Sequence, residues 1–339
     1  MLLSSILLYL FKKQNSTIIT LLTIPTKINM KKISLIFLVS LLFLTKTYAM
    51  NYNDWFTAYH ETIICVDEKG LQPGMTTYPM KPDKFLRQQI LGKANFKLKR
   101  GNKIFPFNNA KDAGLVRTVY GFKLTGTVEK IKYIVDCAPM ILGRNSNNRE
   151  GGMIIKLSLE NGVKPNDEII VNYGGLARGE WVLPHTRYKL LESDDFPCAA
   201  NNVITDEKNY TIISSPDLTA SVGITAKSGN RKILFSKNEK LNTAQAAWLL
   251  GNSNHQELFI SVAFAKDQKE LPKVLSDNPV EQLKKSKKYF KKISEMAVVK
   301  TPVKNIDETF KWGVLCLEYC YINHWDGLNH STIGLLYIQ

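Results

Sequence analysis

Several short motifs that would assign a chemistry to this chain are missing from its sequence. There is no Gly-rich phosphate-binding loop, no nucleophile elbow and no metalloprotease signature. The glycine pairs Gly151–Gly152 and Gly174–Gly175 are not followed by a helix that could hold a phosphate, so nucleotide binding has no support. Function therefore has to be inferred from the order of the predicted elements.

Cysteine is also scarce, and its spacing suits neither a full set of disulfides nor a zinc site. There are 5 cysteines, so at least one would be unpaired in an exported protein. Cys316 and Cys320 are four residues apart on a predicted helix, but no histidine or cysteine pair with zinc spacing accompanies them. We predict structural packing for all five cysteines, no metal and no cofactor.

Residues 1–49 contain no acidic residue, which sets them apart from the rest of the chain. Residues 30–49 begin with Met30 and two lysines, continue through an apolar stretch and end in small residues at Ala49, the pattern of a secretory signal. Because the apolar stretch is short for a transmembrane helix, we expect no stable membrane span after cleavage. We expect a periplasmic or secreted protein, with the residues before Met30 as an upstream extension. The alternative is that the two apolar patches of residues 1–49 anchor the protein as paired helices.

The formal net charge of +15 would favour a nucleic-acid partner only if the basic residues lay on a recognition element. Six of the positive charges are lysines of residues 1–49, and much of the remainder lies in the lysine-rich run 283–293. Lysines at helical spacing usually form a solvated helix face. No zinc finger, aromatic stacking motif or basic recognition helix accompanies them, so we predict no nucleic-acid partner.

Alternation of apolar and polar residues dominates the middle of the chain. The predicted strands are 61–67, 96–99, 103–107, 115–124, 128–135, 153–159, 168–173, 209–214, 220–226, 231–235, 246–250 and 257–264. Asn161–Gly162 is a strong hairpin turn signal. Residues 72–75 are typical of a turn, and residues 83–91 of a short helix. Roughly ten or more short strands without an intervening helix favour a large antiparallel β-sandwich over residues 50–265.

The apolar spacing becomes helical after the last strand, and residues 266–304 are predicted to be a helical linker. The linker helices are 267–276 and 279–296. Residues 305–339 begin a further helix, with Asn305 as N-cap and Glu308 three residues later. The apolar stripe of that helix comprises Ile306, Phe310, Val314, Leu317 and Tyr321. The predicted fold class is mainly β, a large antiparallel β-sandwich followed by a few C-terminal α-helices, the start of an incomplete, truncated α/α barrel.

This order resembles that of six-hairpin glycosidases, such as the glycogen-debranching and rhamnosidase-like groups, in which a β-sandwich and a helical linker precede an (α/α)6 barrel. Leu258–Ala265 is similar to the last sandwich strand of that family, and Ile306–Trp312, with Leu317–Glu318 one turn later, resembles the first barrel helix. The resemblance covers most of residues 96–339 and implies hydrolysis of an oligo- or polysaccharide by paired carboxylates. Because the chain supplies only the first barrel helix and a fragment of the next, those carboxylates would lie mainly outside it, and this fragment would be inactive.

The predicted substrate contacts lie in the aromatic and polar turn 323–327. Trp325 offers a flat apolar face to a sugar ring, and Asp326 and His324 can form hydrogen bonds with its hydroxyl groups. The alternative is a helix–helix turn whose tryptophan packs in the core and whose aspartate caps the next helix. Trp312 is a further candidate for substrate contact, with core packing as its alternative.

Other polar positions suggest structural roles. Asp136 follows an apolar strand, and a turn hydrogen bond at the strand end is expected there rather than a perturbed carboxylate. The loop 145–152 and the acidic pair Asp194–Asp195 are expected to be solvated. A second hypothesis of another class is a non-catalytic periplasmic protein, a carbohydrate-binding or structural β-sandwich with a helical tail for a partner.

Overall fold

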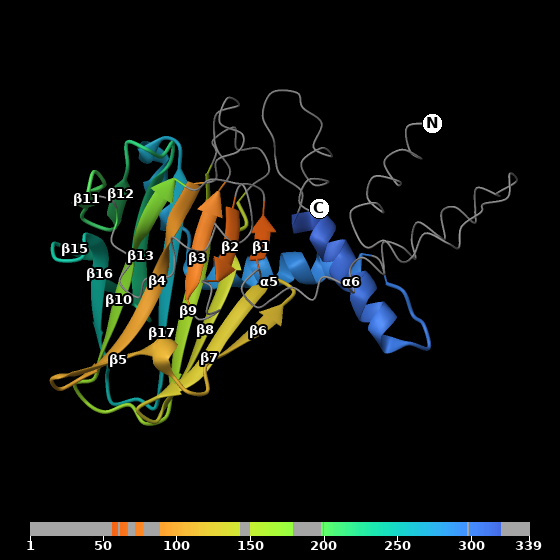
Figure 1. Cartoon of the computed structure of the whole chain (residues 1–339), viewed down its shortest axis with the longest axis horizontal. Coiled ribbons are helices and arrows are strands. Elements are labelled where there is room, and N and C mark those ends of the chain that lie inside the picture. The colour runs from red at the N-terminus through yellow and green to blue at the C-terminus, as the bar shows by residue number, and fades with distance from the viewer. Residues whose placement is uncertain are drawn as a thin grey trace, which may run out of the picture. The chain divides into compact units, whose positions relative to one another are not determined.

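The computed structural model describes residues 56–59, 62–66, 72–77, 89–142, 150–178, 198, 200–296 and 298–319, all within one compact unit, Met50–Gln339. The predicted signal segment and the turn 323–327 lie outside the described residues. The described chain is mainly β, as predicted, and its strands form two antiparallel sheets that face each other (Figure 1).

The first sheet has eight strands in the order β1-β2-β3-β4-β10-β16-β15, and β5 also pairs with β4. Its strands are β1 (Phe56–Tyr59), β2 (Thr62–Val66), β3 (Pro73–Thr77), β4 (Gln89–Arg100), β5 (Lys103–Pro106), β10 (Glu168–Arg178), β15 (Ser236–Asn238) and β16 (Thr243–Leu249). The second sheet has nine strands in the order β11-β12-β13-β17-β9-β8-β7-β6, and β14 also pairs with β13. Its strands are β6 (Gly114–Thr118), β7 (Gly121–Val128), β8 (Ile131–Pro139), β9 (Glu150–Glu160), β11 (Val203–Asp206), β12 (Thr211–Ser214), β13 (Ser221–Ser228), β14 (Arg231–Ile233) and β17 (His255–Ala265).

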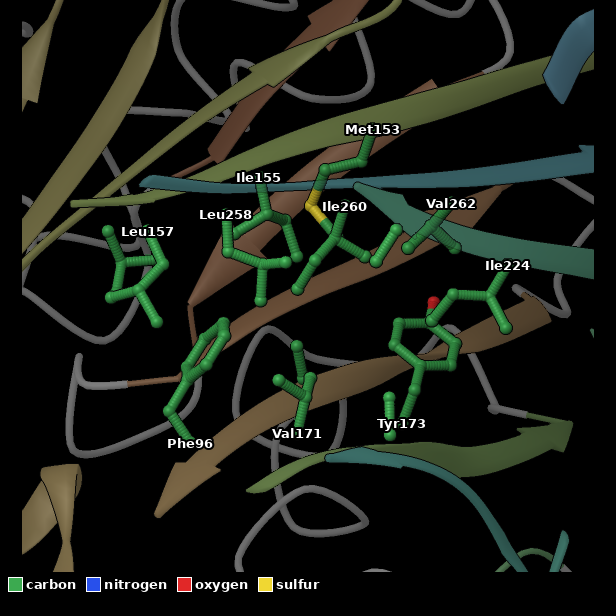
Figure 2. Close-up of a cluster of buried hydrophobic side chains, with 14 of the residues drawn as sticks. Phe96, Met153, Ile155, Leu157, Val171, Tyr173, Ile224, Leu258, Ile260 and Val262 are labelled. Atoms are coloured by element: carbon green, nitrogen blue, oxygen red, sulfur yellow. The ribbon is translucent and has the colours of Figure 1, made fainter. Parts of the chain in front are cut away.

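The main core fills the space between the two sheets. Figure 2 shows Phe96, Val171 and Tyr173 of the eight-stranded sheet opposite aliphatic side chains of the nine-stranded sheet, which include Met153, Ile155, Leu157, Leu258, Ile260 and Val262. Each fully buried side chain of this size stabilises the fold by roughly 1.5–3 kcal/mol. The buried Tyr173 hydroxyl donates a hydrogen bond to the Leu91 carbonyl oxygen at 2.8 Å, so the polar atom does not offset this gain.

The outer face of the nine-stranded sheet is covered by two helices, α4 (Leu271–Ser276) and α5 (Pro279–Glu295). A 3₁₀ turn, η4 (Gln268–Glu270), leads into α4, and another, η3 (Phe107–Asn109), follows β5. Leu271, Leu275 and Leu283 pack against the sheet. The central strands β9 and β17 are therefore buried on both faces, which explains their nearly continuous apolar sequence. Asn278 caps α5 by accepting a hydrogen bond from the Val280 amide at 3.1 Å.

Helix α6 (Lys304–Tyr319) lies beside α5 and β1 (Figure 1). It begins one residue before Asn305, so the predicted N-cap is wrong: this residue lies inside the helix, and its carbonyl oxygen accepts from the Thr309 hydroxyl. The predicted apolar stripe is also rotated from the contact face. Leu315 is fully buried, whereas Ile306 is 40% exposed, because the surface that the helix meets selects the side that it buries.

Several strand predictions were wrong in instructive ways. Residues 73–75 belong to β3 instead of a turn, and residues 89–91 belong to β4 instead of a helix. The Asn161–Gly162 turn exists, with φ values of 59° and 64°, but it connects β9 to β10 in the other sheet instead of closing a hairpin. A hairpin does close at Glu129–Lys130 between β7 and β8, with positive φ at both residues.

Candidate functional site

The outer face of the eight-stranded sheet, opposite the sandwich core, carries an unusual row of amide side chains. Asn95 of β4 lies beside Asn172 of β10, which in turn lies beside Gln245 of β16. The neighbouring residues along each strand point into the core, as Phe96 and Val171 do, so the three amides share the outer face.

An apolar area adjoins this row. Ile170 lies next to Ala247 in the register, and Leu249 is one further step along β16 on the same face. Leu249 is 49% exposed, Ala247 is exposed and Ile170 is half-buried. We call these six residues the outer-face patch: Asn95, Asn172, Gln245, Ile170, Ala247 and Leu249.

Burial increases from the apolar area towards the amides. Gln245 is half-buried and its Oε1 atom accepts a hydrogen bond from Asn238 Nδ2 at 2.8 Å. Asn172 is only 4% exposed, and its Oδ1 atom receives no hydrogen bond from any described residue. A buried carbonyl oxygen without a donor is uncommon in native proteins, and a bound water or ligand is one of its ordinary explanations.

The chemistry of the outer-face patch suits a neutral sugar. An amide group offers two N–H donors and a carbonyl acceptor, so it can serve a hydroxyl group in either role. The apolar side chains next to it, which have Lys97 and Glu168 as neighbours in the register, can contact the C–H face of a pyranose ring. The sequence placed Asn172 inside a predicted strand, but the predicted strands 96–99 and 246–250 each began one residue after Asn95 and Gln245. No sequence pattern could reveal that β4, β10 and β16 are neighbours.

Of the four predicted site residues, Trp312 alone lies within the described part of the chain. His324, Trp325 and Asp326 lie outside the described residues. Trp312 is partly buried and packs against apolar side chains of the sandwich and of α5, including Phe290. This position supports the core-packing alternative for Trp312, because its ring is engaged by protein on more than one side.

A polar cluster lies between α5 and the nine-stranded sheet. Asp136 is in the middle of β8, with 8% of its side chain exposed, and its Oδ2 atom is 2.7 Å from Lys287 Nζ. The Tyr120 hydroxyl donates to the same oxygen at 3.3 Å, and Lys287 Nζ lies 4.9 Å from the Tyr120 ring centroid. The expected strand-end turn bond at Asp136 is therefore wrong, since its carboxylate attaches the helix to the sheet. Burial raises the pKa of Tyr120, and the Asp136 charge adds to this effect.

A second tie joins α5 to α6, where the hydroxyl of Tyr289 donates to Glu318 Oε1. Tyr289 also meets the rings of Tyr59 and Phe290 edge to face, with centroid distances of 5.1 Å and 5.2 Å. Both carboxylates of this helix–sheet region, Asp136 and Glu318, are thus held by protein partners. This arrangement fixes helix positions and leaves neither carboxylate facing open solvent as a general acid or base.

The cysteines of the described part of the chain have structural roles. Cys65, Cys137 and Cys198 are buried, which confirms the predicted packing role for these three. Burial raises the pKa of the Cys137 thiol, which keeps it protonated and unreactive. No group of three or more His, Cys, Asp or Glu side chains among the described residues could hold a metal ion. None of the described helices is both long and apolar enough to cross a membrane.

Comparison with known proteins identifies no family for this chain. No protein-family model and no curated protein matches the sequence. Among solved structures, the chain is similar to one described as "Putative kojibiose phosphorylase from human microbiome", with 9% sequence identity and a TM-score of 0.34. The match covers 78% of this chain and 35% of that chain, so the protein spans about a third of the length of its structural neighbour. A likeness at this level assigns neither a family nor an activity.

Proposed function

We propose that this chain is the sugar-binding and scaffolding part of an exported carbohydrate-active protein of the glycoside hydrolase-like class. The observation that carries the proposal is the outer-face patch, in which three aligned amides adjoin an apolar surface. Gln245 is the half-buried amide that a sugar hydroxyl would reach, and the buried acceptor Asn172 Oδ1, which no described donor reaches, would accept a hydrogen bond from the sugar after the groups that cover it move aside.

A scaffolding role follows from the order and packing of the elements. The linker helices α4 and α5 lie on the nine-stranded sheet, and α6 packs beside α5. The carboxylates at this junction hold Lys287 and Tyr289, so they do not form the facing acid and base that glycoside hydrolysis requires. We propose that the catalytic carboxylates belong to further helices and that this chain alone is inactive.

Export is proposed from the signal pattern of residues 30–49. A fusion of residues 1–60 to alkaline phosphatase, an enzyme that is active only outside the cytoplasm, would test it. We expect phosphatase activity and loss of the signal segment in the mature fusion. An inactive or uncleaved fusion would contradict export through a cleaved signal.

Binding to neutral sugars is the decisive test of the proposal. The full chain would be applied to a glycan array and then titrated with the best neutral oligosaccharide by isothermal calorimetry. Asn172→Ala and Gln245→Ala should each weaken binding about fivefold, the value of one net hydrogen bond. Thr205→Ala, an exposed change on β11 of the other sheet, should leave affinity unchanged.

Three further outcomes decide between the parts of the proposal. Reducing-sugar release by the purified chain would overturn the scaffolding role while leaving sugar binding intact. Absence of binding to every glycan would overturn the carbohydrate proposal itself and favour a structural β-sandwich. An affinity that survives both amide substitutions would place the sugar elsewhere than the outer-face patch.

A further inference from the structure

Helix α5 carries six lysines, and the structure divides them into two groups. Those with an acidic partner are Lys284, Lys287 and Lys291. Those that are exposed and form no ion pair with any described residue are Lys285, Lys288 and Lys292. We call the second group the lysine stripe.

The lysine stripe is a continuous row of positive charge on one side of the helix. Its residues are three and four positions apart, so they follow one helix face. An α-helix rises about 1.5 Å per residue, which separates the charges by about 4.5 Å and about 6 Å along the axis. Glu281 and Glu295 flank the two ends of the stripe on the same helix face, and each is paired with a neighbouring lysine, Lys284 and Lys291.

The packing of α5 fixes the direction in which the lysine stripe points. Leu283 and Phe290, which are buried, attach the opposite side of α5 to the sandwich and its neighbouring elements. The ion pair between Lys287 and Asp136 adds a polar tie on the same inner side. The stripe is therefore presented to solvent on a fixed helix, which reduces the entropy lost when a ligand binds.

We infer that the lysine stripe binds a linear anionic polysaccharide, a polymer with a carboxylate or sulfate on its successive sugar units. The row of charges complements a polymer whose anionic groups recur at intervals of about one sugar ring. The carbohydrate part of this inference rests on the proposed function, whereas the preference for negative charge rests on the stripe itself.

Two other anionic partners fit the surface less well. A helix that lies in a membrane surface needs a free apolar face beside its basic face, but the apolar face of α5 is already buried against protein. Single-stranded nucleic acid is usually held by aromatic side chains between basic ones, and the exposed face of α5 has only lysines and glutamates. A flexible anionic glycan requires neither feature.

The test compares two triple variants of the full chain with the same loss of charge. One carries Lys285→Gln, Lys288→Gln and Lys292→Gln. The control replaces three exposed lysines scattered over the sandwich: Lys111→Gln, Lys208→Gln and Lys240→Gln. Binding to immobilised polygalacturonate, to dextran as a neutral glycan and to phosphatidylglycerol vesicles would be measured at about 50 mM and about 500 mM salt.

We expect the lysine-stripe variant to bind polygalacturonate about tenfold more weakly at low salt, with the control variant close to the parent. High salt should remove this difference. Equal losses in both variants would show that net charge alone acts, and an unchanged stripe variant would also overturn the inference. Tighter stripe-dependent binding to vesicles than to polygalacturonate would identify a membrane partner instead. If neutral glycans bind and polygalacturonate does not, this inference fails while the proposed function stands; if no glycan of either class binds, the proposed function fails as well.

Discussion

The ion pair between Lys287 and Asp136 offers a sharp test of how the linker helix is held on the sandwich. The two partners differ in exposure, with 39% of the Lys287 side chain exposed and 8% of the Asp136 side chain exposed. Because of this difference, removing Lys287 and removing Asp136 should lower the free energy of unfolding by different amounts. A lysine left alone can turn its ammonium to water, whereas an aspartate left alone stays buried.

We expect Lys287→Met to lower the free energy of unfolding by about 2–3 kcal/mol, since Asp136 would keep only the 3.3 Å hydrogen bond from Tyr120. This is less than the cost of breaking a fully buried pair, because water reaches Lys287. Asp136→Asn should lower the free energy of unfolding by only about 1 kcal/mol. Replacing both partners by apolar residues, Lys287→Met with Asp136→Leu, should return the protein to within about 1 kcal/mol of its original stability.

Urea unfolding measures these differences, provided that the m value stays constant across the variants. Lys284→Met is the matched control on the same helix, since its partner Glu281 is exposed, and it should change stability by less than about 0.5 kcal/mol. The reasoning is refuted if Asp136→Asn destabilises the protein as much as Lys287→Met. It is refuted equally if the double variant loses the sum of the two single effects.

Three further predictions address the sandwich and α6. Arg100 binds Asp167 through two hydrogen bonds of 2.9 Å and 2.7 Å, so Arg100→Met should cost about 3 kcal/mol at neutral pH. Burial tends to raise the pKa of Asp167, but the Arg100 hydrogen bond helps to lower it below its ordinary value of 3.8. The stability that this pair contributes should therefore be present above pH 3.8 and lost as the pH falls below that value. In an acid titration of unfolding, this loss should be steeper in the parent protein than in the Arg100→Met variant. A Cβ atom on Gly223 would lie 2.7 Å from Leu275 Cδ1 of α4, so Gly223→Ala should lower the free energy of unfolding, measured in urea, by about 1–2 kcal/mol. The double variant with Leu275→Ala should lose less stability than the sum of the two single variants. Trp312→Ala should accelerate amide hydrogen exchange in α6 but not in β8 or β9, and Trp312→Phe should accelerate it much less. Unchanged exchange together with weaker glycan binding would instead favour a sugar contact at Trp312.

Sequence patterns predicted the type of most long elements correctly. Alternation of apolar and polar residues located strands β8 to β10, β13 and β17, although the predicted start of β8 lay before its turn with β7. The predicted strand 115–124 was wrong, because it runs through the turn at residues 119–120 that separates β6 from β7. Helical apolar spacing after the last strand predicted helix α5, in which Leu283 and Phe290 are buried. These patterns succeed because backbone geometry fixes their period before any tertiary contact forms.

Short and chemically unusual elements could not be predicted in the same way. The hairpin at Glu129–Lys130 has none of the glycine or asparagine that normally signals positive φ, and β3 begins at a proline next to a glycine. Pairing with neighbouring strands outweighs these local preferences. The turn at Asn161–Gly162 has the expected chemistry, but whether such a turn closes a hairpin depends on which sheet receives the next strand.

The sequence by itself determined the class of the protein: a β-rich region followed by amphipathic helices, with lysines on the solvent face of α5. Only the tertiary structure decided which residues meet. It placed Asn95, Asn172 and Gln245 on adjacent strands and set Asp136 opposite Lys287, 151 residues away in the chain. The physical reason is that local periodicity fixes which face a side chain occupies, whereas the neighbours of that face depend on how the strands are distributed between two sheets and on where the helices pack.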